Sequence, residues 1–536
     1  MREDKNSLWA QDLTQAVTTL RHPLSARPAR CLLVAMTILI CAALSLSIMA
    51  EEDSEQTLWS CGGGPDGKWL CREQEPQSSV IAKGNRPARS INKTRPADPE
   101  EPRVARVLNL DWVEEEDMTP EQRLSLDPYC CGAYVEPRRD YPDADLEFDA
   151  VKLDRKDLTH LTCLAIDNSY SSDADDAISI DGDRIWIHIA DVASFVDIDS
   201  ELDIFARKRI SNLYLPDQIF HMLPPMLSEA CSLGANHLSN AISIGFLLNE
   251  FEVNDIQIYL SQIKVTKMSY EEADEEINSN RTLAVLNEIA KVHKAYRDGN
   301  GAIQLNLPNT DIKLKDSKVH IFPQTDSESR SLVSEMMILA GRVIAEFSVE
   351  NSISMPYLSQ EPGNFSDEVI KNINKLSPSK AFEAARGFNR SKLSVKHSLH
   401  SGLGLEAYLR VTSPMRRYLD LLVQQQLVRF ITKNDLLNET DIKERIKAVN
   451  ASVSKINKAT RQSVEHFRCV YFKQNKQWEG EGVIVEVKGQ KASVLIPELA
   501  MIAQVKFKSK VELEEEIKLK VISSNLFERS IDFKPL

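Results

Sequence analysis

Alternating apolar and polar residues predict a β-strand near the middle of the chain. In DRIWIHIADV, residues 183–192, the isoleucines at 185, 187 and 189 fall on one side of an extended chain, and Trp186 and His188 fall on the other. A short apolar run of strand length, LTCLAI, lies just upstream at 161–166. The residues between these two predicted strands are therefore expected to form a loop at the edge of a core.

The end of the chain has a similar alternation in shorter runs. Residues 476–536 include WEGEGVIVEVKG and VELEEEIKLKVISSN, with Gly and Lys at the expected turns. This pattern is typical of a small antiparallel barrel. Residues 431–475, just before it, read as polar helices. Their apolar residues at helical spacing are expected to be core contacts: Ile446, Val449, Val453 and Ile456.

The beginning of the chain has a different pattern. Residues 31–50 form an uninterrupted apolar run that follows Arg21, Arg27 and Arg30. Such a run indicates a secretory signal or a membrane helix, and its length does not separate the two. The stretch from 78 to 103, rich in Pro, Arg, Ser and Asn, is typical of a linker.

Four aspartates crowd the loop between the first two predicted strands. They are Asp167, Asp173, Asp175 and Asp176, in the sequence IDNSYSSDADDA. Carboxylates held so close repel one another unless a cation lies among them, and Mg²⁺ prefers such hard oxygen ligands. An acidic, solvated turn is the simpler explanation of the loop taken alone, since Asp, Ser and Asn favour turns. The spacing does not match that of a calcium-binding loop.

A second candidate segment lies far along the chain, at GLGLEAYLRVTSPMRRYLDLL, residues 402–422. The run Thr412, Ser413, Pro414 predicts the start of a helix with Pro in its first turn. Arg416 and Arg417 would then lie near the positive end of that helix, where phosphate binds readily.

Together these segments resemble the RNB catalytic domain of the ribonuclease II family. The aspartates match the acidic signature of the family, and residues 402–420 match its GLGL and TSPIRRY signature, with Met415 in place of Ile. NLYLPDQIFHMLPPMLSEACSL at 212–233 and the helix-like SEMMILAGRVIAEF also resemble family segments. The resemblance runs from about residue 147 to the end. It implies an α+β fold, with an RNB core of mixed sheet and helices at 147–475 and an OB-fold barrel at 476–536.

The resemblance also implies a chemistry. The family activity is Mg²⁺-dependent hydrolysis of single-stranded RNA from the 3′ end to 5′-mononucleotides. Phosphodiester hydrolysis needs an activated water and neutralisation of charge on the phosphate, which one or two Mg²⁺ ions held by the four aspartates would supply. Asp175 is expected to be the most critical of them. Arg416 would contact the scissile phosphate, because a guanidinium fork suits phosphate. Arg417 is a weaker candidate, since neighbouring helical residues point about 100° apart.

Further RNA contacts follow from the same resemblance. Tyr214 matches an aromatic residue that stacks on the last base, although an ordinary rim tyrosine is the alternative. Glu335 matches an acidic position near the nucleotide pocket, although a surface glutamate of a helix would look the same. The lysines of the barrel would face the RNA backbone: Lys488, Lys491, Lys506, Lys508 and Lys510. His400 is kept off the metal list, because Mg²⁺ prefers oxygen. Gln424 and Gly341 stand where relatives often carry His and Asn.

Residues 51–146 resemble another family, the amino-terminal region of the LPS-assembly outer-membrane protein LptD. CGGGPDGKWLC and MTPEQRLSLDPYCCGAYVEPRRDYPDAD carry this resemblance, and an envelope location would suit disulfides among Cys61, Cys71, Cys130 and Cys131. With residues 1–50 as signal or membrane helix, the first part predicts membrane association and export, whereas the nuclease part predicts a cytoplasmic enzyme. We therefore interpret the chain as two unrelated segments joined in one reading frame, with a nuclease tethered to the inner membrane as the alternative.

Composition narrows the interpretation without deciding it. The net charge of -14 argues against a uniformly basic surface, so RNA would be held by local basic tracks. The cysteines at 163, 231 and 469 have no metal-binding spacing and are expected to be buried thiols. We expect a monomeric catalytic part without a nucleotide cofactor. Two alternatives remain open: an envelope protein of lipopolysaccharide export, and an RNA-binding protein with an inactive nuclease core.

Overall fold

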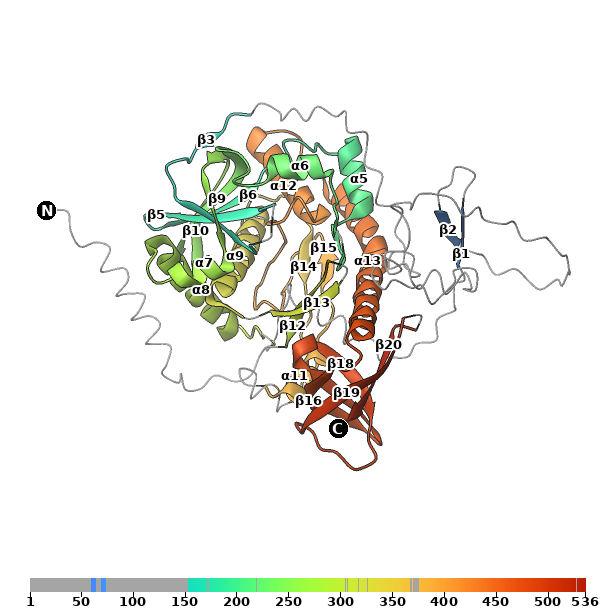
Figure 1. Cartoon of the computed structure of the whole chain (residues 1–536). Helices are drawn as coiled ribbons and strands as arrows, with labels where there is room; N and C mark the ends of the chain where they lie inside the picture. Colours follow the sequence, from blue (N-terminus) through green and yellow to red (C-terminus); the bar gives the residue numbers. More distant parts are fainter. Residues whose placement is uncertain are drawn as a thin grey trace.

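The structure is a computed structural model of the whole chain (Figure 1). It describes residues 59–63, 69–73 and 153–536, the last range without 170, 172, 218, 304, 306, 317, 325, 367–368, 370–375 and 527. The first two ranges form the antiparallel strands β1 (Trp59–Gly63) and β2 (Trp69–Glu73), in which Cys61 is the register partner of Cys71. The predicted apolar helix at 31–50 lies outside the described residues. Within the described residues, we find no helix with the length and apolar character that a membrane crossing requires.

A mixed seven-stranded sheet forms the centre of the larger body. Its order is β11 (Val265–Ser269), β4 (Cys163–Asp167), β5 (Asp176–Asp181), β6 (Arg184–Ala190), β9 (Ser239–Asn249), β10 (Glu252–Ile263) and β3 (Lys156–Asp157). The two edge pairings, β11 with β4 and β10 with β3, are parallel, and the inner pairings are antiparallel. The acidic loop therefore connects β4 to β5, a strand that the sequence pattern did not predict and whose residues were expected to belong to the loop before β6.

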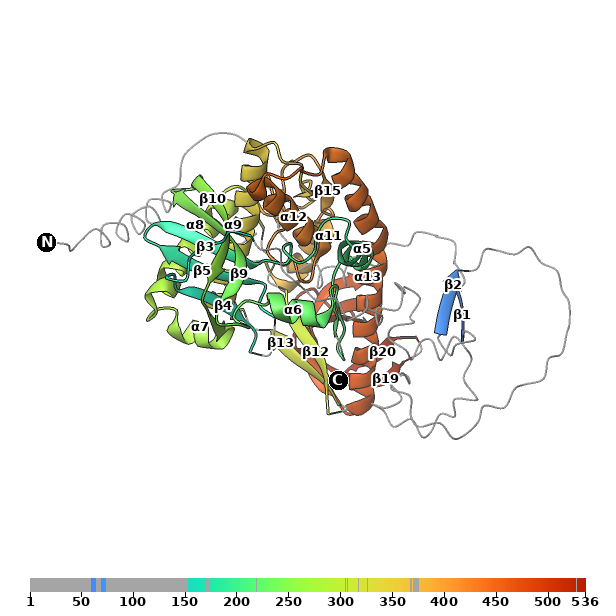
Figure 2. The same cartoon turned by 90° about the horizontal axis from the view of Figure 1, so that it is seen from above.

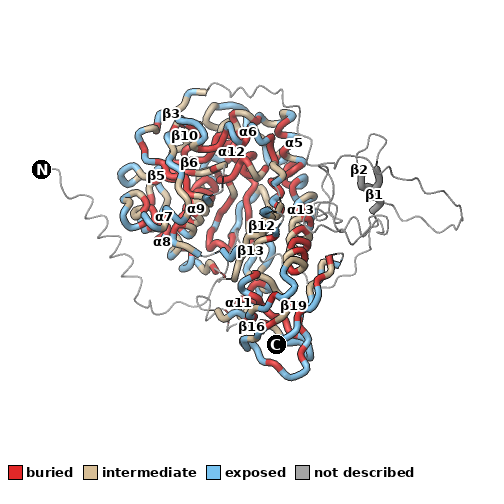
Figure 3. The backbone as a smooth tube through the Cα atoms, viewed as in Figure 1, coloured by how far each residue is buried: buried red, intermediate tan, exposed pale blue. Residues whose placement is uncertain are grey.

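The alternation in β6 determines which side chains face which half of the core. Ile185, Ile187 and Ile189 are at most 1% exposed and pack in one apolar cluster, whereas Trp186 belongs to a second cluster beyond the sheet. His188 shares the Trp186 face, and the two rings are stacked. The strand prediction is confirmed, and both faces of the sheet are covered (Figure 3).

Helices cover the two faces of the sheet (Figure 2). One face packs against α7 (Tyr270–Glu276), α8 (Arg281–Gly299) and α9 (Glu328–Glu350). The other packs against α5 (Glu201–Arg209), α6 (Pro225–Cys231) and the start of α12 (Tyr418–Thr432). Because α12 contributes Tyr418 and Leu421 to one cluster and Val423 and Leu427 to the other, it joins the two halves of the core.

A single long helix, α13 (Glu439–Gln474), runs from this body to the C-terminal barrel. The prediction of several polar helices at 431–475 is thus wrong in detail. Asn438 and Asp441 form a capping box at its start. Ile446, Val449 and Ile456 are buried as expected, but Val453 is 41% exposed because the buried stripe turns away from it.

The barrel contains β16 (Glu479–Lys488), β17 (Lys491–Ile496), β18 (Met501–Lys506), β19 (Glu516–Asn525) and β20 (Ser530–Pro535). All neighbouring strands are antiparallel, in the order β18-β17-β16-β19-β20, and the edge strands β18 and β20 lie close together. Its own apolar core includes Ile484, Val494 and Phe533. The predicted barrel and the α+β class are confirmed.

Two further two-stranded antiparallel sheets are present in the described residues. One is the hairpin of β12 (Asn309–Lys315) with β13 (Lys318–Gln324), and the other pairs β14 (Tyr357–Ser359) with β15 (Lys392–Ser394) across a long connection. A short pair, β7 (Leu213–Tyr214) with β8 (Ile219–Phe220), lies near α6. A helix, α11 (Pro378–Gly387), packs on the barrel.

Candidate active site

The acidic loop is held by the sheet on one side and by the segment after α6 on the other. The amide of Ala174 donates to the Ser232 hydroxyl at 3.1 Å, and the amide of Leu233 donates to the Ala174 carbonyl at 3.0 Å. The amide of Ala190 in β6 donates to the Asp175 carbonyl at 2.8 Å. The end of the loop is therefore fixed by backbone bonds, which gives the side chains that follow a defined direction.

Asp175 forms the central ion pair of the site. Its carboxylate is 5% exposed and accepts from Arg416 Nε at 2.9 Å and from the Met415 amide at 3.2 Å. Burial raises the pKa of Asp175 to about 6, although the charge and hydrogen bond of Arg416 oppose the rise. Met415 and Arg416, which follow Asp175 by 240 and 241 positions in the chain, thus meet at its carboxylate.

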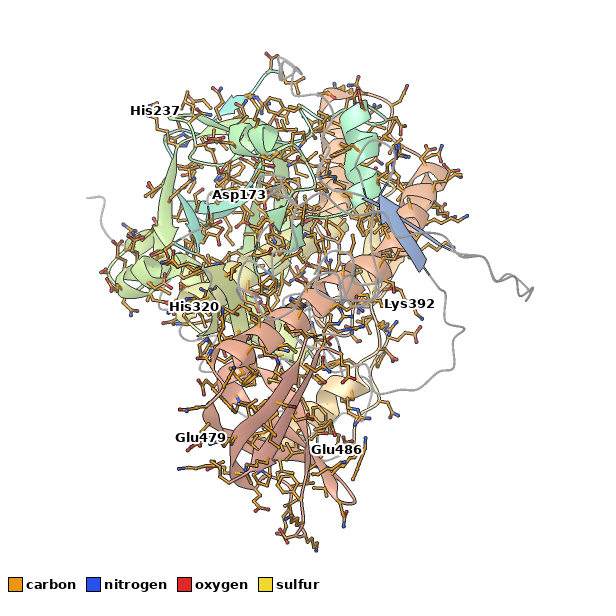
Figure 4. The ribbon with its side chains drawn as sticks, turned by 45° about the vertical axis from the view of Figure 1, so that its right-hand side comes forward. Asp173, His237, His320, Lys392, Glu479 and Glu486 are labelled. Atoms are coloured by element: carbon orange, nitrogen blue, oxygen red, sulfur yellow. The ribbon has the colours of Figure 1, made fainter. Side chains whose placement is uncertain are left out.

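The neighbouring carboxylates carry charge that Arg416 does not fully balance. Burial, together with the negative charges of Asp175 and Asp167, raises the pKa of Asp176 to about 7, although Arg416 and Arg417 oppose the rise. Asp167 accepts from the Asn168 amide at 2.7 Å, and Asp173, partly exposed, lies in the same loop (Figure 4). Clustered anions of this kind are stabilised by a cation, so the chemistry of the donors fits Mg²⁺. Within the described part of the chain, however, no three acidic, His or Cys side chains already converge at metal-binding distance.

Residues 414–416, which include Arg416, form a turn outside the helix, and this corrects the predicted helix start at 412–414. α12 begins only at Tyr418, and Arg417 before it has β-type backbone angles. The reason is a tertiary pairing: the Asn212 amide donates to the Arg416 carbonyl at 2.9 Å, and the Tyr418 amide donates to the Ile210 carbonyl at 2.9 Å. Together with the isolated bridge between Ser211 and Arg417, these bonds hold residues 416–418 against 210–212. Arg417 is the N-cap of α12, so Arg416 lies directly before the N-terminus of a helix that begins later than predicted.

Arg416 and Arg417 have separate surroundings as a result. Arg417 donates to Asp420 from Nε at 3.0 Å and from a terminal nitrogen at 2.7 Å, and also to the Ser413 hydroxyl. Asp420 also accepts from the Ser413 amide at 3.0 Å. The Arg417 side chain therefore fastens the turn before α12, whereas the Arg416 side chain, 42% exposed, faces the acidic loop.

Tyr214 is brought to the same place by this strand pairing. It lies in β7, directly after the residues that pair with 416–418, and its side chain is 46% exposed. Its hydroxyl accepts from the Asn212 amide group at 3.3 Å. Burial raises the pKa of the Tyr214 phenol, and the charges of Arg416, Asp175 and Asp173 also act on it. An exposed ring thus lies beside the Asp175–Arg416 pair.

The other predicted RNA contacts do not join this group. Glu335 is 5% exposed within α9, where it pairs with Arg297 and accepts from His293 Nδ1 at 3.1 Å. Because this carboxylate is buried between two helices, the geometry gives no support to an RNA contact by Glu335. Lys488 and Lys506 lie on the barrel, where Lys491 is the register partner of both. Lys488 also pairs with Glu486 at 3.1 Å.

Sequence reasoning missed Arg330. It lies in the first turn of α9 and donates to the Asn168 side chain at 2.7 Å, while its guanidinium stacks over the Tyr270 ring at 4.0 Å. Burial raises the pKa of the Tyr270 phenol, and the charges of Asp167 and Asp176 add to the rise, so this pair borders the acidic loop. A positive residue in the first turn of a helix is unfavourable, because the helix dipole is positive there. This unfavourable position was the feature of the sequence that could have pointed to Arg330.

The structure also explains the two departures from the family pattern. Gln424 is fully buried; its side-chain oxygen accepts from the amides of Val192 and Ala193 at 3.0 Å each, and its nitrogen donates to the Ala190 carbonyl at 2.7 Å. It therefore ties α12 to the end of β6. At Gly341, an added Cβ would collide with the Leu409 carbonyl and the Tyr408 ring, so the close approach of that segment requires glycine.

The fold and the site define an α+β protein with a mixed sheet, a C-terminal barrel, and an acidic loop beside a fixed guanidinium. Comparison with known proteins identifies the family. Residues 155–433 match the RNB domain, and the chain belongs to the RNB-domain family.

Among curated proteins, the chain is similar to an uncharacterized ribonuclease of Synechocystis (32% identity, 74% of this chain, 61% of that protein). It is also similar to the chloroplastic/mitochondrial ribonuclease II of Arabidopsis thaliana (27% identity, 77% of this chain, 54% of that protein). A third relative is ribonuclease R of Chlamydia pneumoniae (31% identity, 51% of this chain, 47% of that protein). The chain thus spans about half to three fifths of the length of these relatives.

Solved structures agree on the fold. A Candida glabrata Dss1 exoribonuclease active-site mutant superposes with a TM-score of 0.65 (24% identity, 72% of this chain, 56% of that chain). The Mycoplasma genitalium RNase R bound to ribose-methylated single-stranded RNA gives a TM-score of 0.62 (18% identity, 78% of this chain, 77% of that chain). The yeast pseudonuclease Ssd1 gives a TM-score of 0.59 (18% identity, 75% of this chain, 58% of that chain). None of these matches supports the predicted resemblance of residues 51–146 to LptD, and that interpretation is withdrawn.

Proposed function

We propose that the chain is a Mg²⁺-dependent exoribonuclease that hydrolyses single-stranded RNA from the 3′ end and releases 5′-mononucleotides. The observation that carries the proposal is the ion pair between Asp175 and Arg416, with further aspartates in the same loop and the exposed Tyr214 ring beside it. The ribonucleases among the relatives support RNA as the substrate.

The aspartates would hold one or two Mg²⁺ ions, with Asp175 the most critical: Asp167, Asp173, Asp175 and Asp176. When bound, the metal activates water and neutralises charge on the phosphate. Burial raises the pKa of Asp175 and of Asp176, and a bound cation would favour their charged forms.

Arg416 would bind the scissile phosphate. Its Nε is used by Asp175, and among the described residues no partner takes its terminal guanidinium nitrogens. The ion pair fixes the plane of the guanidinium, so less side-chain entropy is lost when a phosphate binds. Arg417 would serve to hold the turn that carries Arg416, which is a change from the direct RNA contact expected from the sequence.

Tyr214 would set the end at which the enzyme works. A ring that stacks on the terminal base accepts any sequence, because every base has a π-face worth about 1–3 kcal/mol. Its position beside Arg416 would place the terminal phosphodiester near the acidic loop.

The pseudonuclease among the structural neighbours favours one alternative, an RNA-binding protein with an inactive core. The presence of all four aspartates and of the Asp175–Arg416 pair argues against it. An envelope function has no support in the comparisons. The expected cytoplasmic site of action remains part of this proposal.

The test is hydrolysis of a 5′-labelled, single-stranded RNA of thirty nucleotides by the purified full chain, with Mg²⁺ or with EDTA. We expect a descending ladder, a short labelled remnant and 5′-mononucleotides, all dependent on Mg²⁺. A circular RNA of the same sequence is the control and should stay intact. Internal fragments from the circle would refute the exonuclease, and binding without any cleavage would favour the inactive alternative.

A further inference from the structure

The β12–β13 hairpin has one face that its core contacts do not explain. Its inner face packs into the core: Val319 is 3% exposed and clusters with Phe467 and Val470 of α13, and Ile321 packs against the barrel core. Because side chains alternate along a strand, the residues between these positions face the other way.

The outer face combines aromatic rings with lysines. Across the hairpin, Lys313 is the register partner of His320, and Lys315 is the partner of Lys318. The rings of His320 and Phe322 are stacked, with centroids 5.8 Å apart and planes 17° from parallel. Phe322 is 49% exposed, so this apolar ring is not used in the core. Three lysines share this face with one carboxylate, Asp311, and the exposed Asp316 lies in the turn between Lys315 and Lys318, so the hairpin keeps a small net positive charge in an acidic protein.

The hairpin lies between the candidate active site and the barrel. The Leu314 amide donates to the Pro216 carbonyl at 2.9 Å, and Pro216 follows Tyr214 by two residues. At the other end, the Thr310 hydroxyl donates to the Leu499 carbonyl of the barrel at 3.4 Å. Figure 4 shows His320 between Asp173 of the acidic loop and the barrel, which Glu479 and Glu486 mark.

We infer that this outer face binds the single-stranded RNA that enters ahead of the 3′ end. Bases would stack on the His320–Phe322 pair, and phosphates would lie against Lys315 and Lys318. Rings interleaved with cations suit a flexible polyanion with exposed bases, and the contact with Pro216 makes the face continuous with the Tyr214 strand. The inference rests on the proposed function and adds to it a stacking site remote from the chemistry.

The double variant His320→Ala, Phe322→Ala in the full chain tests the stacking. Its affinity for a thirty-nucleotide RNA, measured by anisotropy in EDTA, should fall about tenfold or more, as expected for the loss of one or two stacked bases. Turnover of a saturating tetranucleotide should stay within about twofold of wild type. Phe322→Trp should keep the affinity. The matched control is Leu436→Ala, which removes an exposed apolar side chain between α12 and α13 and should leave the affinity unchanged.

The salt dependence tests the lysines. Lys315→Ala, Lys318→Ala should reduce the slope of log K against log salt by about 0.7 for each lost phosphate contact, whereas Lys447→Ala on α13 should leave it unchanged. If the ring variant keeps its RNA affinity and the lysine variant keeps its salt slope, the inference is wrong, and a protein partner would be the alternative occupant of this face. If wild type fails to cleave either RNA, the proposed function fails, while the binding comparison still decides the inference.

Discussion

Substitution of Asp175 by Asn should separate RNA binding from cleavage. The change keeps the shape of the side chain but removes the charge that pairs with Arg416 at 2.9 Å. It also replaces one acceptor oxygen with an NH2 donor, so Asn can accept from the Met415 amide or from the arginine but not from both. The site would therefore lose its most buried carboxylate ligand and part of the support for Arg416.

The structure sets the expected size of each effect. Breaking a fully buried ion pair costs about 3–5 kcal/mol, but Arg416 is 42% exposed and can return to water. The loss of folding stability should therefore be smaller, about 1–2 kcal/mol. The rate should fall at least about a thousandfold, or ~4 kcal/mol in activation free energy. RNA affinity should change little, because one fewer anion also repels phosphate less.

The assay measures initial rate and affinity on one single-stranded oligonucleotide, with thermal unfolding as a check of folding. Asp183→Asn is the matched control, since Asp183 is an exposed carboxylate in the next turn of the sheet. If the Asp175 variant keeps more than about a tenth of the wild-type rate, a barrier change of only ~1.4 kcal/mol, the role assigned to Asp175 is wrong.

Four further predictions follow from particular contacts. Tyr214→Ala should weaken binding of the RNA 3′ end by about 1–3 kcal/mol, while Tyr214→Phe should not; equal losses in both variants would contradict stacking. Arg330→Ala should lower turnover and raise the Mg²⁺ concentration needed for half-maximal rate, because Asn168 beside Asp167 loses its anchor; an unchanged Mg²⁺ titration would exclude a positioning role. Burial alone would raise the pKa of Glu335, but His293 and Arg297 lower the pKa from 4.5 to about 2. The charged carboxylate therefore stabilises the fold above pH 4.5, and this contribution to stability is lost as the pH falls toward 2. Glu335→Gln should therefore lower the free energy of unfolding at pH 7 but hardly at pH 2, as denaturant titrations at both pH values would show. Deletion of residues 1–146 should leave turnover of saturating short RNA within tenfold, because every proposed catalytic residue lies downstream; a well-folded truncation that is slower than that would make the first segment part of the enzyme.

Local pattern was sufficient for much of the fold. The alternation of Ile185, Ile187 and Ile189 with Trp186 and His188 predicted a strand with two distinct faces, because side chains in an extended chain alternate regardless of context. The short runs after residue 476 predicted the barrel for the same reason. The motif matches on either side of the core predicted the RNB family, which the comparison over residues 155–433 confirms.

What the sequence by itself determined was the set of chemical groups; the tertiary structure decided how they are used. Thr412, Ser413 and Pro414 favour a helix start locally, yet strand pairing with residues 210–212 delays α12 to Tyr418. Two adjacent arginines look alike in sequence, but Arg417 pairs with Asp420 and Arg416 pairs with Asp175. Partners more than 200 residues apart leave no periodic signal in either segment, because their contact depends on how the sheet and α12 pack. Charge, propensity and alternation are properties of the chain, whereas burial and ion pairing exist only once distant segments meet.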